Sequence, residues 1–373
     1  MKSNYKKLGD YIRLVDERNT NGSVTRLLGV SIEKKFIESI ANTIGTDMSI
    51  YKIVRKGQFA YGPVTSRNGD KVSIALLEEE KCIISSSYSV FEIVNMQELL
   101  PEYLNLWFKR PEFDRYARFH SHGSAREIFD WEEMCNVELP IPEIEKQRKI
   151  VEAYNTIERR IALKRKINDN LEAHIQSIFE ESFPDCTLGG QTKLGDYAEC
   201  VLGGTPSRDN QEYWNGDIAW INSGKVNDFR ITTASESITK LGLSKSATKL
   251  MPKHTVVLAI TGATLGQESI LLIESSANQS VVGILENPTI PYEFIHPFIK
   301  KSMRELLRNQ TGGAQPHINK DDVNNIPLSL PTPQELDKYT RKVRPLFNLI
   351  EKNMFELDKL TVLLTSLLTR LSR

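Results

Sequence analysis

The chain has 373 residues and carries 48 basic and 48 acidic side chains, so its formal net charge is zero. This balance argues against a stand-alone nucleic-acid binder, whose surface is usually basic, and the composition is that of a globular protein with two or three domains. No apolar run is long enough to span a bilayer, and no signal peptide is evident. Four scattered cysteines lack zinc-ligand spacing, so we expect a cytoplasmic protein with free thiols.

Residues 1–138 form the first predicted domain, which mixes strands with short helices. Segments 51–54, 72–77, 82–84 and 88–93 are rich in β-branched and aromatic residues and are separated by charged or glycine turns, which predicts strands. Segment 101–110 begins with Pro101 and places apolar residues on one face, which predicts a short helix.

Residues 139–183 carry the first of two heptad patterns, which predict long helices. Apolar residues alternate at spacings of four and three, interrupted by Lys164 and Asn168. One interpretation places Asn168 in the helix seam, where a polar partner would fix the register at a cost in stability. The alternative places Lys164 and Asn168 just off the seam, with Ile167 making the contact.

Residues 184–330 form the second predicted domain. Segments 256–260 and 269–273 are predicted buried strands, and 292–309 is predicted to be helical over much of its length. Loops are indicated by glycine and proline at 203–206, and a tight turn between strands is indicated at 261–266. We expect Tyr213, Trp214 and Trp220 to pack the core of this domain.

Residues 331–373 carry the second heptad pattern. Thr332, Pro333 and Glu335 have the order of a capping box with proline in the first turn. Because proline lacks a backbone donor, we expect Pro345 to divide a short helix from a long one. The stretch 346–371 would then be roughly 40 Å long at about 1.5 Å per residue.

The chain repeats itself with a long period. Leu8-Gly9-Asp10-Tyr11 returns as Leu194-Gly195-Asp196-Tyr197, and the paired prolines 140/142 and 331/333 each open a heptad stretch. The regions between these markers differ in sequence. We therefore predict an α+β fold with a pseudo-twofold internal repeat, in which two mixed α/β domains are separated by two long antiparallel coiled-coil helices.

Motifs for catalysis are not found in the sequence. Ser223-Gly224-Lys225-Val226 lacks the flanking residues of a phosphate-binding loop, and no histidine has a metal-site or triad context. We therefore predict a non-enzymatic chain with no metal or cofactor of its own.

The ordered motifs resemble the specificity (S) subunits of type I restriction–modification systems. The resemblance covers essentially the whole chain and rests on the repeat, the proline-led helices and motifs of the second domain. These are Gly203-Gly204-Thr205-Pro206-Ser207, the segment 213–221, the segment 261–266, Asn278-Gln279-Ser280 and Gly312-Gly313-Ala314-Gln315. The first half matches less closely and lacks the Gly-Gly-Thr-Pro loop.

The resemblance implies a DNA-recognition role within a larger complex. Each domain would be a target recognition domain that reads one half of a bipartite site in double-stranded DNA. The two helices would set the spacing and dock two methyltransferase (M) subunits that methylate adenine, and the resemblance leaves open whether restriction/translocase (R) subunits join. S-adenosylmethionine, ATP and Mg would be bound by the partner subunits only, and no membrane partner is implied.

Candidate DNA-contacting residues are polar side chains able to reach base edges or phosphates. In the first domain these are Tyr61, Ser66, Arg67, Asn68, Lys71, Ser124 and Arg126, and in the second domain Thr205, Ser207, Arg208, Asn222, Ser223, Lys225, Asn278, Gln279, Gln315 and His317.

Two other interpretations fit parts of the sequence. A non-catalytic adaptor could join two protein-binding domains through an antiparallel coiled coil, which the zero net charge fits slightly better. An enzyme with an unrecognised site is the other, and methylation by the purified chain alone would support it.

Overall fold

The computed structural model describes residues 5–39, 45–66, 69, 71–123, 126–187, 192–309 and 318–371, with side chains of 306–309 excepted. The chain divides into two compact units, one of residues 1–160 and 360–373 and the other of residues 161–359. Two long helices, α4 (Ile144–Ser182) and α8 (Pro333–Arg370), therefore contribute to both units. No helix among the described residues is long and apolar enough to cross a membrane.

The first unit is built on a four-stranded antiparallel sheet. Its strand order is β2-β9-β6-β7, formed by Ile12–Val15, Ser89–Ile93, Phe59–Tyr61 and Ile74–Leu76. The two-stranded sheets are β1 (Tyr5–Lys7) with β10 (Glu138–Pro140), β3 (Leu28–Val30) with β4 (Phe36–Glu38), and β5 (Lys52–Arg55) with β8 (Lys81–Ile84). Helices are α1 (Pro101–Phe108), α2 (Pro111–Phe119) and α3 (Trp131–Cys135), with short 3₁₀ turns η1 (Leu8–Asp10) and η2 (Met48–Ile50).

The second unit repeats this plan. Its sheet has the order β11-β18-β15-β16, formed by Cys200–Leu202, Val281–Ile284, Val256–Ala259 and Glu268–Ile270. A second sheet has the order β13-β12-β17-β14, formed by Glu236–Ile238, Trp214–Ile221, Ser275–Ala277 and Leu250–Met251. The helices are α5 (Lys240–Ser244), α6 (Tyr292–Asn309) and α7 (Lys320–Asn324), with 3₁₀ turns η3 (Leu194–Asp196), η4 (Gln211–Tyr213), η5 (Ser223–Asn227) and η6 (Gly262–Thr264).

The repeated Leu-Gly-Asp segment has the same environment in both units. Leu8 donates its backbone N–H to the Val137 carbonyl, and Leu194 donates to the Ile326 carbonyl. A side chain at Gly9 would meet Cys135 of α3 at 2.8 Å, and one at Gly195 would meet Asn324 of α7 at 3.1 Å. Glycine permits the close approach of each turn to a short helix, more tightly at Gly9 than at Gly195, and the predicted internal repeat is confirmed.

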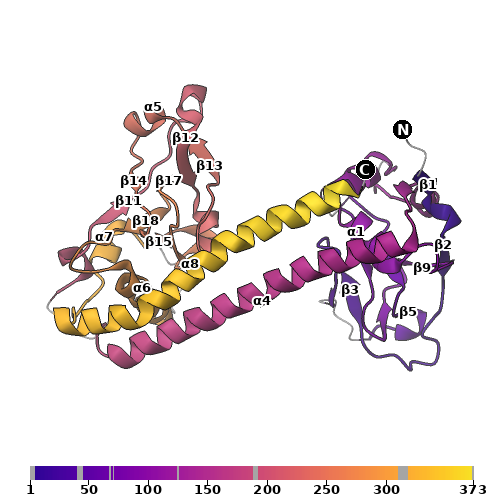
Figure 1. Cartoon of the computed structure of the whole chain (residues 1–373), viewed down its shortest axis with the longest axis horizontal. Coiled ribbons are helices and arrows are strands. Elements are labelled where there is room, and N and C mark those ends of the chain that lie inside the picture. The colour runs from indigo at the N-terminus through magenta and orange to yellow at the C-terminus, as the bar shows by residue number, and fades with distance from the viewer. Residues whose placement is uncertain are drawn as a thin grey trace. The chain divides into compact units, whose positions relative to one another are not determined.

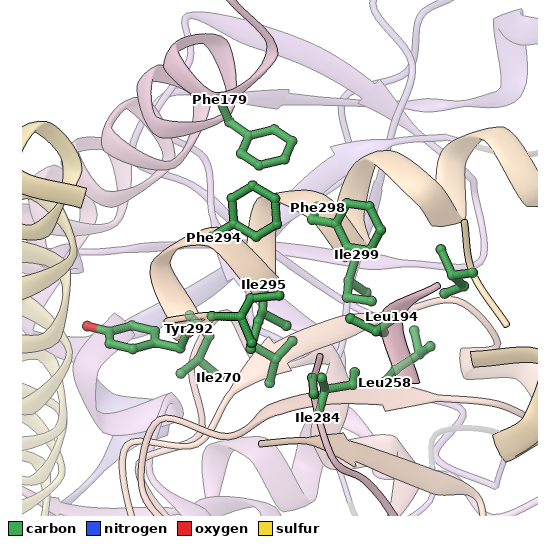
Figure 2. Packing of buried hydrophobic residues seen from close by; sticks show 14 of the residues in the cluster. Phe179, Leu194, Leu258, Ile270, Ile284, Tyr292, Phe294, Ile295, Phe298 and Ile299 are labelled. Carbon is green, nitrogen blue, oxygen red and sulfur yellow. The ribbon is translucent and has the colours of Figure 1, made fainter. Parts of the chain in front are cut away.

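The core of the second unit forms where α6 lies between the sheet and α4 (Figure 1). Figure 2 shows Phe294, Ile295, Phe298 and Ile299 of α6 between Phe179 of α4 and the strand residues Leu258, Ile270 and Ile284. All eight side chains are buried. Burying each of them contributes roughly 1.5–3 kcal/mol relative to leaving it exposed, which anchors α4 to the sheet of this unit.

The helices α4 and α8 run antiparallel, as the heptad patterns predicted. In the second unit Asn168 is 2% exposed and its Oδ1 accepts from Asn353 Nδ2 at 2.8 Å. Lys164 Nζ donates to Asn353 Oδ1 at 2.8 Å, whereas Ile167 is 37% exposed. The interpretation that places Asn168 in the seam with a polar partner is therefore confirmed, and the alternative with Ile167 in the contact is wrong.

Pro345 does not divide α8, so that prediction is wrong. The helix is continuous from Pro333 to Arg370. Tyr339 and Val343 before the proline, and Phe347 and Ile350 after it, pack into the same core. Their burial offsets the missing backbone donor, and the proline is accommodated inside the helix. The predicted capping box is confirmed, because Thr332 N donates to Glu335 Oε2 at 2.9 Å. All four cysteines are free thiols.

Candidate nucleic-acid interface

Four segments of the second unit meet where its strands end. The strands β12 and β17 are parallel, so their carboxyl ends lie together, and Asn278 N donates to the Ile221 carbonyl at 3.0 Å. Gly203 N, after β11, donates to the Val281 carbonyl, and Ile260 N, after β15, donates to the Ser280 carbonyl, each at 3.0 Å. We call these segments, residues 203–208, 222–228, 260–266 and 278–280, the second loop edge.

Two glycines permit the close approach of the backbone at this edge. A Cβ at Gly203 would lie 2.1 Å from the Asn278 carbonyl oxygen, and a Cβ at Gly204 would lie 2.5 Å from Thr248 N. Neither neighbour is the movable end of a side chain, so any larger residue would displace main chain. The Gly-Gly-Thr-Pro motif thus holds the following Thr205 beside the 278–280 turn.

Several predicted site residues are brought together here. Thr205 Oγ1 donates to Gln279 Oε1 at 2.6 Å, and Asn278 Oδ1 accepts from Ser280 N at 3.1 Å. Asn222 caps η5 by accepting from Lys225 N at 3.1 Å. Ser207 is exposed and Ser223 half-buried. The edge therefore presents hydroxyl and amide groups on a fixed backbone, which are the groups that read base edges.

Arg208 is held against two tryptophans. Its guanidinium lies 3.6 Å from the Trp214 ring centroid, and its two terminal nitrogens donate to the Glu236 carboxylate at 2.6 and 2.8 Å. The hydrogen bond to Glu236 raises the pKa of Arg208, so its charge is permanent but locally balanced. Trp220 is buried and donates to the Gly204 carbonyl at 3.1 Å, so it packs the domain, as expected.

The remaining cation of this edge is Lys225. Its Nζ lies 2.7 Å from Asp228 and 3.1 Å from Thr233 Oγ1. Because Arg208 and Lys225 both have carboxylate partners, contact with a phosphate requires that the phosphate replace or join these carboxylates.

In the first unit the structure corrects one predicted site residue. Tyr61 has no exposed surface and lies 6.1 Å from Phe91 in the aromatic core. It sits on β6, a central strand, and so faces the core rather than a partner. Ser66, Lys71 and Arg126 are exposed, as contact with DNA would require. Arg67, Asn68, Ser124, Gln315 and His317 lie outside the described residues.

The first unit has an equivalent loop edge. Thr65, after β6, donates its N–H to the Glu127 carbonyl and its hydroxyl to Ser121 Oγ, both at 3.0 Å. Phe129 N donates to the Pro63 carbonyl at 2.8 Å. We call residues 62–66 and 118–128, as far as they are described, together with 87–89, the first loop edge. The registers Phe59↔Phe91 and Leu258↔Val282 make 87–89 the counterpart of 278–280.

Sequence reasoning missed residues at the first loop edge. Phe119, the last residue of α2, is 81% exposed, and Arg118 beside it donates to the Gly69 carbonyl at 2.9 Å. Ser87 and Tyr88 lie in the turn before β9. The signal that could have found Phe119 is an aromatic residue between Arg118 and two histidines at the end of an amphipathic segment.

The family model described as "Type I restriction modification DNA specificity domain" matches residues 19–173 and 191–361. The chain belongs to the specificity (S) subunits of type I restriction–modification systems. The first match contains strands β9, β6 and β7 with the first loop edge, and the second contains both four-stranded sheets with the second loop edge.

Two known specificity subunits are similar to this chain at low sequence identity. The chain is 20% identical to the HindI specificity subunit of Haemophilus influenzae over 98% of this chain and 97% of that one. It is 27% identical to the MjaIX specificity subunit of Methanocaldococcus jannaschii over 43% of this chain and 38% of that one. The crystal structure of an S subunit from M. genitalium superposes with a TM-score of 0.59 at 13% identity, covering 99% and 96% of the two chains, which supports the fold of this S subunit.

Proposed function

We propose that this S subunit reads a bipartite DNA site, with one half-site bound at each loop edge. The observation that carries the proposal is the same strand order in both units, β2-β9-β6-β7 and β11-β18-β15-β16, with different side chains at the strand ends. A shared backbone frame with unlike polar loops is suited to reading two unrelated sequences, because a few side chains decide base discrimination.

Exchange of one domain tests this directly. Residues 194–327 would be replaced by the equivalent segment of another S subunit, and the methylated motif would be determined by sequencing modified bases. We expect one half-site to change while the other and the gap stay the same. A change in both half-sites would contradict a model with two independent readers.

We propose further that α4 and α8 set the gap between the half-sites. The helices have 39 and 38 residues, and each contributes to both units. Inserting one heptad after residue 160 and one after residue 359 would lengthen both helices by about 10 Å. We expect the unread gap to grow by about three base pairs at 3.4 Å per pair, with both half-sites unchanged.

The helices are also the proposed docking surface for two M subunits. In the second unit, Leu163 and Ile167 of α4 lie one turn apart and are 58% and 37% exposed. In the part of α8 that belongs to the first unit, Val362 and Leu363 are 70% and 51% exposed. Neighbouring apolar side chains on a helix surface are typical of a protein interface. Replacing Leu163 and Ile167 by Ser is expected to reduce copurification with M while leaving the fold intact.

We propose that the chain has no catalytic activity and that the M subunits bind S-adenosylmethionine and flip the target adenine out of each half-site. ATP and Mg would belong to R subunits where these join. The test compares methyl transfer by the purified chain, by M alone and by the complex. Sequence-specific transfer is expected only from the complex, and transfer by the chain alone would refute the proposal.

A further inference from the structure

A buried cluster of charged side chains joins α4 to the second loop edge. Glu172 of α4 and Arg230 have side chains that are 9% and 3% exposed, and Arg230 Nη2 donates to Glu172 Oε2 at 2.5 Å. Lys300 of α6 donates to Glu172 Oε1 at 3.1 Å and lies 3.7 Å from Glu268. His296 Nδ1 lies 3.5 Å from the same Glu172 oxygen. All five residues belong to the second unit.

His296 is neutral in this cluster, whereas Glu172 is ionised. Burial lowers the pKa of His296 to about 3, so this imidazole is neutral at pH 7. Burial opposes ionisation of Glu172, but Arg230 and Lys300 outweigh it and hold the pKa of Glu172 below its usual range. Glu172 is therefore a carboxylate whose closest cation is Arg230. Removing Glu172 leaves the Arg230 guanidinium buried without its ion-pair partner, which is strongly destabilising, and removing Arg230 leaves Glu172 paired with Lys300 alone.

Arg230 lies two residues after the loop-edge segment 222–228, so the Glu172–Arg230 pair also holds the end of that segment. The segment 222–228, with Asn222, Ser223 and Lys225, begins directly after β12, where Asn278 N donates to the Ile221 carbonyl. It ends at Asp228, whose carbonyl accepts from Ser269 Oγ at 2.8 Å. Arg230 follows, and Ile231 N then donates to the Ile270 carbonyl at 3.0 Å. The segment is thus held at one end by the sheet and at the other by strand β16 and by α4.

We infer that Glu172 and Arg230 are a positioning pair for DNA recognition, which fixes segment 222–228 to helix α4 so that its side chains meet the second half-site in one geometry. The inference rests on the proposed function of the second loop edge. Base discrimination requires that hydrogen-bonding groups be placed accurately. A site therefore becomes less selective when the contacts that support it are lost. Loss of the pair should therefore relax recognition of one half-site only.

The chain offers a matched control. Glu293 of α6 is also buried and accepts from Arg344 Nε of α8 at 2.6 Å. This second pair ties a long helix to α6 in the same unit, but neither residue adjoins a loop-edge segment. Glu172→Gln and Glu293→Gln thus each remove the buried carboxylate of a carboxylate–guanidinium pair that anchors a long helix, and the guanidinium is 3% exposed in the first pair and 57% exposed in the second.

The test measures how tightly the complex with M binds DNA duplexes in which one base pair of either half-site is replaced by another base pair. Each such replacement is expected to weaken binding by the wild-type complex about 5- to 150-fold. In Glu172→Gln we expect the loss of affinity caused by a base-pair replacement in the second half-site to shrink by about tenfold or to disappear, while the loss caused by a replacement in the first half-site stays the same. Glu293→Gln should show the wild-type loss of affinity for replacements in both half-sites. All measurements are made at a temperature at which circular dichroism shows that each variant is folded, so that a loss of recognition is not confused with unfolding. Arg230→Lys, which keeps the charge, is expected to have an intermediate effect.

The outcomes separate this inference from the proposed function. If wild type shows no half-site preference, the proposed function fails. If wild type discriminates and Glu172→Gln relaxes both half-sites equally, or matches Glu293→Gln, the positioning role is overturned. If Glu172→Gln does not fold, Arg230→Lys alone decides, and unchanged discrimination in that variant contradicts the inference.

Discussion

The polar layer between α4 and α8 leads to a stability prediction with opposite signs for single and double substitutions. Asn168 and Asn353 are 2% and 4% exposed and are joined by the 2.8 Å hydrogen bond. In Asn168→Leu the Asn353 amide loses its acceptor in a buried seam, which costs about 1–3 kcal/mol. In the double variant both positions are apolar, and Lys164 keeps its ion pair with Glu356 at 2.8 Å.

The magnitudes follow from these contacts. Added apolar burial in the single variant offsets part of the lost hydrogen bond, so we expect a net loss of about 1 kcal/mol. Two leucines facing each other in the seam each contribute roughly 1.5–3 kcal/mol of burial, so the double variant should exceed wild type by at least about 1 kcal/mol. With a similar loss in Asn353→Leu, the coupling energy of the cycle would be about 3 kcal/mol, well above the roughly 0.5 kcal/mol expected of independent sites.

Urea denaturation followed by circular dichroism measures all four corners of the cycle. Asn170→Leu is the matched control, because Asn170 is exposed on the same helix and its replacement should change stability by no more than about 0.5 kcal/mol. Additive effects of the two asparagine substitutions, or a double variant less stable than both singles, would refute the assignment of a buried, mutually satisfied pair.

Three further predictions concern other parts of the molecule. Phe119→Ala should weaken DNA binding by the complex by about 1–3 kcal/mol, the size of a stacking contact, without changing the salt dependence that phosphate contacts produce. Fluorescence anisotropy at two salt concentrations measures both quantities. An unchanged affinity with an altered dependence on salt concentration would contradict the prediction. Hydrogen bonds to Glu286 and Glu351 raise the pKa of His254 above 6.5, so the stabilisation is complete below pH 6.5 and is lost as pH rises through the higher folded-state value. Urea midpoints should therefore fall between about pH 6 and pH 8, and His254→Gln should remove this slope. Gly203→Ala should destabilise the second unit by about 1–3 kcal/mol through overpacking, whereas Gly29→Ala, with no neighbour within 4 Å, should be close to neutral in the same thermal unfolding assay.

Periodic and local signals carried most of the fold prediction. The heptad patterns predicted the helices α4 and α8, and the segments 256–260 and 292–309 predicted β15 (Val256–Ala259) and α6 (Tyr292–Asn309). Such signals depend on residues a few positions apart. The position of Asn168 stayed ambiguous because its partner, Asn353, is 185 residues away. Pro345 was misjudged because the packing that offsets its missing donor is tertiary and cannot be seen locally.

The candidate interface could be predicted only in part, for a related reason. Thr205, Asn222, Asn278 and Gln279 were identified as polar residues in loops. The structure places Asn222 near Asn278 and Gln279 through the parallel pairing of β12 with β17, and it joins Thr205 to Gln279 through a hydrogen bond. Tyr61 was misassigned because no strand was predicted at residues 59–61, where the structure has the central strand β6. Phe119 was missed because exposure of an aromatic side chain is a property of the folded surface.

Under the proposed function, the division between the backbone frame and the loop edge explains how such a chain can change its target without losing its fold. At the second loop edge the backbone is held by main-chain hydrogen bonds from Gly203, Ile260 and Asn278, and none of these bonds uses a side-chain atom. Side chains such as Gln279 project from this backbone and are exposed, so replacing them costs little stability. Gly203 and Gly204 are different, because no side chain fits there. Substitutions that alter the half-site should therefore concentrate at exposed loop positions, while the glycines and the Glu172–Arg230 pair should resist change.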